Sequence, residues 1–166
     1  MPTLGGIMIV VERTFTVETS PAAALAYLTD FGNTQEWDRA ARQTVRHGSG
    51  PLQPGATWRQ ACRILGITAE LTWILIEATG DRLVFLGRNE GATCTDTVLV
   101  RPAPGGTEVT YRVELEMHGL AKLATPVVKI EFEKLGTESA AGLRQALNRL
   151  SAPAWRPSAI PPPAPA

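Results

Sequence analysis

Residues 106–150, GTEVTYRVELEMHGLAKLATPVVKIEFEKLGTESAAGLRQALNRL, decide the fold of this chain. Between Glu108 and His118 apolar and polar side chains alternate, which predicts a half-buried strand. From Pro126 to Leu150 there is no further proline and apolar residues recur at helical spacing, which predicts a helix roughly 37 Å long. The expected apolar stripe of this helix is Val127, Ile130, Leu135, Leu143, Leu147 and Leu150. A strand followed by a long amphipathic helix is typical of an α+β fold, in which the helix covers one face of an antiparallel sheet.

Two glycines, Gly136 and Gly142, interrupt this helical run. Each weakens a helix by about 0.8–1 kcal/mol relative to alanine. Either they allow the helix to pack closely against a neighbouring element, or they leave space beside it. The sequence alone leaves both interpretations open.

Upstream of residue 106 the chain shows one strand, two short helices and five further strands. Residues 8–18 alternate in polarity and form the first strand. Ser20 followed by Pro21 is typical of a helix start, and Asn33 with Glu36 three residues later predicts a capping box at a second, short helix. Turn residues separate the other strands, which are expected at 41–47, 56–65, 67–78, 83–88 and 93–101.

The composition indicates one globular domain. The chain has 166 residues, and its 16 basic and 16 acidic side chains give no net charge, so a nucleic-acid partner is not expected. No apolar run is long enough for a signal peptide or a membrane span, which favours a cytoplasmic protein without stable membrane insertion. We expect a folded domain over residues 8–150 and a disordered, Pro-rich tail over residues 151–166.

Few residues are available for metal or cofactor chemistry. The two cysteines, Cys62 and Cys94, cannot form a disulfide framework or a zinc site, and two histidines cannot form a multi-His metal centre. There is no nucleophile elbow, no His-Glu-x-x-His motif and no phosphate-binding Walker loop. We therefore expect no metal and no cofactor.

Three segments resemble the START-like (SRPBCC) superfamily, which has the helix-grip fold of birch-pollen-allergen-like proteins, and its polyketide cyclase/dehydrase and lipid-transport branch in particular. The segments are Val11–Val17 followed by Thr19–Ala22, Tyr27–Phe31 with Glu36–Asp38, and Gly106–Tyr111 with the following helix, so the likeness covers about residues 8–150. The resemblance implies a seven-stranded curved antiparallel sheet wrapped around a long C-terminal helix, with two short helices between the first and second strands. It also implies a ligand cavity between the sheet and that helix.

Strand parity indicates which side chains face such a cavity. The ligand-binding candidates on the inner face are Trp58, Gln60, Cys62, Leu71, Trp73, Tyr111, Val113 and Met117. For any one of them, membership of an ordinary apolar core is the alternative, because aromatic residues dominate protein cores as well.

Tyr111 and Asp96 are the candidate catalytic residues. If Asp96 faces inward with Cys94 and Val98, desolvation raises its pKa and suits it to proton transfer. If Thr95 and Thr97 form the inner set instead, Asp96 lies in solvent. We prefer the solvent position, because buried carboxylates are uncommon. Arginines at positions 13, 59, 63 and 88 pose the same question, and a solvated face explains them most simply.

Two functions from different classes follow from the resemblance. The first is a binding protein that holds a small hydrophobic or amphipathic molecule, such as a lipid or a polyketide-like compound. The alternative is a cofactor-independent polyketide aromatase/cyclase- or dehydratase-like enzyme, in which the cavity folds a reactive polyketone and Tyr111 or Asp96 assists enolisation or loss of water.

Overall fold

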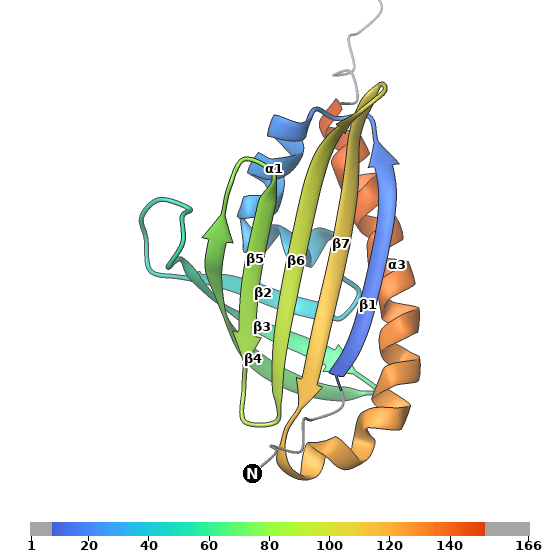
Figure 1. The fold of residues 1–166 in the computed structure, drawn as a ribbon. Coiled ribbons are helices and arrows are strands. Elements are labelled where there is room, and N and C mark those ends of the chain that lie inside the picture. The colour runs from blue at the N-terminus through green and yellow to red at the C-terminus, as the bar shows by residue number, and fades with distance from the viewer. Residues whose placement is uncertain (1–7, 152–166) are drawn as a thin grey trace, which may run out of the picture.

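The structure, a computed structural model, describes residues 8–151. Its elements are β1 (Met8–Val17), α1 (Pro21–Thr29), η1 (Phe31–Asn33), α2 (Thr34–Trp37), β2 (Ala41–His47), β3 (Thr57–Ile64), β4 (Ile67–Ala78), β5 (Arg82–Arg88), β6 (Ala92–Ala103), β7 (Gly106–Met117), η2 (Gly119–Ala124) and α3 (Thr125–Ser151). The predicted α+β helix-grip fold is confirmed (Figure 1). Residues 152–166, where the tail is expected, lie outside the described residues.

All seven strands form one antiparallel sheet in the order β1-β7-β6-β5-β4-β3-β2. Five successive hairpins build the sheet from β2 to β7, and β1 then pairs with β7, so that Val11 lies opposite Val113. The register shifts once between β4 and β5 and once between β2 and β3, and such bulges bend a sheet. Figure 1 shows the result: β2 and β3 run across the direction of β6 and β7, with α3 lying along β1.

The two short helices begin and end at specific side-chain contacts. Ser20 Oγ accepts a hydrogen bond from the Ala23 amide at the start of α1, as predicted. The predicted capping box at Asn33 is wrong, because Asn33 itself has helical backbone angles and lies inside η1. Asp30 caps that turn instead by accepting from the Gly32 backbone N–H, and the Asn33 side chain donates through Nδ2 to the Tyr27 carbonyl. These contacts fix the segment that leads into α2.

The core has an aromatic centre and an aliphatic rim. Phe31 packs against the rings of Trp73 and Phe85, with centroid distances of 4.6 and 4.8 Å, and Trp58 lies 5.9 Å from both Phe31 and Phe85. Trp37 meets Tyr111 edge-on at 5.4 Å. These contacts join the segment between β1 and β2 to the inner face of the sheet.

The two halves of α3 differ in burial. Leu143 and Leu147 in its second half are completely buried, as the apolar stripe predicts, whereas Leu150 at the end of the helix is 45% exposed and the prediction for it is wrong. For Val127 and Ile130 in the first half the prediction is wrong: they are 57% and 74% exposed, and Val128 is buried in their place. The physical reason is the phase of the helix: Val128, Phe132 and Leu135, at i, i+4 and i+7, form the inward face, and Val127 and Ile130 project away from it.

The two helix glycines are positions of close approach, not of empty space. A Cβ atom on Gly142 would lie 2.6 Å from the Trp37 carbonyl oxygen, and one on Gly136 would overlap the side chain of Val11. The absence of side chains at these positions therefore allows α3 to pack directly on β1 and on the end of α2.

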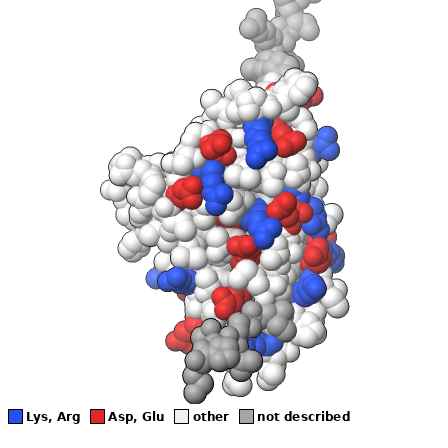
Figure 2. All heavy atoms as spheres, viewed as in Figure 1, with Lys and Arg blue, Asp and Glu red and all other residues white. Residues whose placement is uncertain are grey.

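The visible outer face of the sheet carries charges of both signs, interspersed rather than gathered into one patch (Figure 2). Arg112 forms ion pairs with Glu12 at 3.0 Å and with Glu114 at 2.9 Å. Over residues 8–151, no helix has both the length and the apolar character needed to cross a membrane.

Candidate functional site

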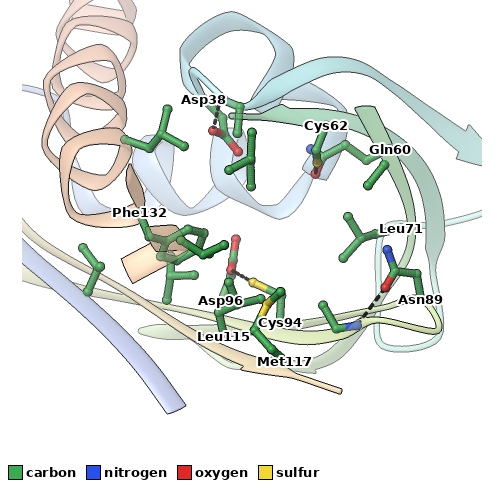
Figure 3. A pocket seen from close by; sticks show the side chains of 18 of the residues that line it. Asp38, Gln60, Cys62, Leu71, Asn89, Cys94, Asp96, Leu115, Met117 and Phe132 are labelled. Carbon is green, nitrogen blue, oxygen red and sulfur yellow. Dashed lines mark hydrogen bonds between the residues drawn. The ribbon is translucent and has the colours of Figure 1, made fainter. Parts of the chain in front are cut away.

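A cavity of about 460 Å³ lies between the inner face of the sheet and the first half of α3 (Figure 3). Its walls come from β1, β3, β4, β6, β7, η2 and α3, and from the segment after α2. Most of the lining is aliphatic or aromatic. Leu65 and Ile67, at the β3–β4 turn, are 46% and 70% exposed and also line the cavity, so it opens to solvent beside that turn. A concave, mostly apolar space with few polar groups is the usual form of a small-molecule site.

Asp96 projects into this cavity from β6. It is only 5% exposed, and therefore the preferred solvent position for Asp96 is wrong. Cys94, Val98 and Val100 share its inward face, while the alternating threonines are only half-buried. The Tyr111 hydroxyl donates to Asp96 Oδ2 at 3.0 Å, and the Cys94 thiol donates to Oδ1 at 3.5 Å. Burial, and after it the charge of Asp38, raises the pKa of Asp96 to about 7, although the hydrogen bonds from Tyr111 and Cys94 act to lower it.

Asp38 faces Asp96 across the cavity, as Figure 3 shows. It follows directly after α2, and its Oδ1 accepts hydrogen bonds from the Ala40 amide at 2.9 Å and from the Ser139 hydroxyl at 3.3 Å. Burial raises the pKa of this carboxyl as well. Sequence reasoning did not identify Asp38 as a site residue. Its place depends on an irregular segment held by α3, for which strand or helix periodicity provides no signal.

The other titratable groups of the cavity stay protonated near neutral pH. Burial and the neighbouring Asp96 raise the pKa of Tyr111 and of Cys94 well above their ordinary values. Burial also raises the pKa of Cys62 to about 12. The two thiols are therefore poor nucleophiles, since the thiolate is the reactive form. Tyr111 is a hydrogen-bond donor whose proton is directed at Asp96.

Two amide side chains at the cavity wall are occupied by structural hydrogen bonds. Gln60 Nε2 donates to the Thr34 and Thr44 hydroxyls, each at 3.0 Å, and its Oε1 accepts from the Cys62 thiol at 3.1 Å. Asn89 closes the β5–β6 turn by accepting from two backbone amides and donating to the Glu70 carbonyl. These bonds fix the orientation of both amides, while Asn89 keeps one N–H and the Gln60 oxygen one acceptor site.

The structure brings most of the predicted ligand-binding residues together. Those that line the cavity are Gln60, Cys62, Leu71, Trp73, Tyr111, Val113 and Met117. Trp58 is instead completely buried in the aromatic centre of the core. The arginines at positions 59, 63 and 88 are exposed. Arg13 is half-buried and reaches α3, where it contacts Glu133 and Thr137. The ligand-binding roles of the predicted cavity residues remain predictions.

Comparison of folds shows several similar structures at low sequence identity. TTHA0849 from Thermus thermophilus has a TM-score of 0.72 and 13% identity, covering 88% of this chain and 100% of that chain. The Zhui aromatase/cyclase from Streptomyces sp. R1128 has a TM-score of 0.68 and 13% identity over 88% and 98%. The major latex-like protein 151 from Panax ginseng has a TM-score of 0.63 and 10% identity over 86% and 99%. At these identities the likeness shows the fold alone.

The sequence itself was also compared with curated proteins and with protein families. No curated protein matched. The family profile described as polyketide cyclase / dehydrase and lipid transport matches residues 8–148, which is nearly the whole described part of the chain. The helix-grip fold and the cavity agree with the predicted START-like superfamily. The chain therefore belongs to the polyketide cyclase/dehydrase and lipid-transport family.

Proposed function

We propose that the chain binds a small, largely apolar molecule in the cavity between the sheet and α3. The carrying observation is the cavity itself, which has about 460 Å³ of space, an apolar lining and an opening beside the β3–β4 turn. Burying apolar ligand surface in such a space contributes roughly 25 cal/mol per Å². The family, which includes lipid-transport proteins, supports the proposal.

A tryptophan on the cavity wall tests this proposal. Ala69 lines the cavity from β4, and the neighbouring Thr68 is exposed. We expect Ala69→Trp to fill the space and to weaken binding of the neutral fluorescent probe N-phenyl-1-naphthylamine about tenfold or more. Thr68→Trp is the matched control and should bind the probe as the wild type does. Fluorescence titration measures both. Failure of the wild type to bind the probe, or equal affinities of the two variants, would contradict the proposal.

Polyketide cyclisation is a second candidate function, favoured by one specific contact. The Tyr111–Asp96 hydrogen bond places a carboxylate and a proton donor together at the wall of the cavity. With a pKa of about 7, Asp96 is matched to proton transfer near neutral pH. It would take a proton from a carbon between two ketones of a bound polyketide. The resulting enolate carbon would attack a second carbonyl, whose oxygen would receive the proton. The aromatase/cyclase among the structural neighbours makes this reaction class the one to test.

For this second function we expect Asp96→Asn to abolish turnover of a supplied poly-β-ketone and Tyr111→Phe to reduce it about 10²-fold, the low end of acid–base contributions. Product formation is followed by liquid chromatography. Probe binding measured in parallel separates lost chemistry from a lost cavity. Turnover unchanged in both variants would remove these two residues from any reaction.

A further inference from the structure

The charges of the cavity lining are all of one sign. Among the described residues that line it, the charged side chains are Asp38 and Asp96, and no lysine, arginine or histidine is present. The remaining titratable groups, Tyr111, Cys62 and Cys94, are protonated and neutral. Arg13 lies two residues after Val11 on β1 and so on the same face of the strand. Its guanidinium forms an ion pair with Glu133 at 3.1 Å.

Around the two carboxyl groups the free hydrogen-bonding capacity is also one-sided. The donors that face them are already used: Tyr111 and Cys94 donate to Asp96, and Ser139 donates to Asp38. Of the other lining donors, the Trp73 indole N–H has no partner but is fully buried, and Asn89 keeps one N–H at the exposed β5–β6 turn. The hydrogen bonds from the Ala40 amide and the Ser139 hydroxyl both end on Oδ1 of Asp38. Because a carboxylate has about four acceptor sites, Asp38 keeps capacity to accept a further bond. The polar positions still available between Asp38 and Asp96 are therefore acceptors on the two carboxyl groups.

This combination discriminates between ligands with the same apolar body. A carboxylate or phosphate head placed beside Asp38 and Asp96 would meet two carboxyl groups whose neighbouring donors are already used, and burying an unpaired charge is strongly unfavourable. A protonated amine would pair with Asp38 or Asp96 at reduced dielectric, where a charge pair is worth several times its value in water. A hydroxyl head would donate one hydrogen bond to a carboxyl group, and the affinity of such a ligand would lie between those of the anion and the amine.

We propose that this cavity selects apolar molecules with a hydrogen-bond-donating head group, a protonated amine above all, and discriminates against carboxylates and phosphates. The inference rests on the proposed binding function and names the ligand class for the same cavity. Specificity here comes from a repulsive element, the pair of facing carboxyl groups, as much as from an attractive one.

Three ligands with one naphthalene body test the selection: 2-naphthylethylamine, 2-naphthylethanol and 2-naphthylacetate. Each displaces N-phenyl-1-naphthylamine from the full chain in a fluorescence competition. At pH 8, where the Asp96 carboxyl is mainly charged, we expect the amine to bind about tenfold or more tightly than the carboxylate, with the alcohol between. At pH 5.5 protonation of Asp96 should reduce this affinity ratio. The amine is charged at both pH values, so its own titration does not cause the change.

Variants locate the cause of the preference. Asp38→Asn and Asp96→Asn should each lower the amine-to-carboxylate ratio several-fold. Glu70→Gln, which removes one exposed negative charge from the outer face of β4, should leave the ratio unchanged. Circular dichroism confirms that each variant is folded.

The outcomes separate the two proposals. Probe binding without head-group selection, or a preference that persists in both aspartate variants, overturns this inference alone. Absence of probe binding to the wild type overturns the binding function and this inference with it. An amine preference lost in either aspartate variant but kept in Glu70→Gln supports the inference.

Discussion

Replacing Gly142 with alanine is expected to destabilise the folded protein by about 3 kcal/mol. In an isolated helix the same change is stabilising by about 1 kcal/mol. Here the new Cβ would lie 2.6 Å from the Trp37 carbonyl oxygen, a backbone atom at the end of α2. Forced overpacking typically costs about 1–3 kcal/mol and occasionally more, and a backbone atom cannot move aside as a side chain can. Urea denaturation followed by circular dichroism measures the effect.

The neighbouring Ala141 provides the reciprocal control. It is exposed on α3, so Ala141→Gly should cost only the helix-propensity difference of about 1 kcal/mol. If Gly142→Ala instead stabilised the protein, α3 would not pack against the end of α2 as described. Asp38, which follows Trp37, would then lose its support as well.

Asp96 should make the wild-type protein less stable as pH rises. In the unfolded chain this carboxyl has its ordinary pKa of 3.8, whereas in the folded protein its pKa is raised to about 7. Between these values the folded state binds more protons than the unfolded state, so the free energy of unfolding falls with increasing pH and levels off above about 7. From pH 5 to pH 8 this one group should remove roughly 2–3 kcal/mol. Asp38 contributes in the same direction.

Asp96→Asn should remove most of this pH dependence. The amide cannot ionise, and its oxygen can still accept the hydrogen bond from Tyr111. We therefore expect the variant to match or exceed the wild type in stability at pH 8 and to lose its advantage at pH 5. Urea midpoints across this range, with Glu70→Gln as the exposed control, provide the measurement. An unchanged pH profile in Asp96→Asn would show that Asp96 is ionised normally in the fold.

Strand periodicity was sufficient to predict the inner face of β3, β4 and β7. In β3, for example, Trp58, Gln60 and Cys62 alternate with residues suited to solvent, and all three are buried. The same reasoning was ambiguous for β6, because threonine is compatible with either face and one carboxylate breaks the apolar set. Cross-strand pairing resolves it: Asp96 lies opposite Val113, whose inward direction was already clear.

Two features of the site were not predicted from the sequence: the position of Asp38 and the inward face of the first half of α3. Asp38 occupies an irregular segment, and its position follows from α3 through Ser139 and the close approach at Gly142. In the first half of α3, apolar residues lie on both sides of the helix, and the predicted stripe took Val127 and Ile130 in place of Val128 and Phe132, which line the cavity.

The pairing of β1 with β7 has a consequence for how the chain folds during synthesis. β1 is the first strand to be synthesised, yet its only neighbour in the sheet is β7, the last strand. The helix α3, which packs on β1, is synthesised after β7. At ribosomal speeds of about 5–20 residues per second, Val11 waits roughly 5–20 s for Val113 to appear. The hairpins from β2 to β6 can assemble in the meantime, because their contacts are local in sequence. Closure of β1 onto β7, a contact of very high sequence separation, is then the step expected to limit the folding rate.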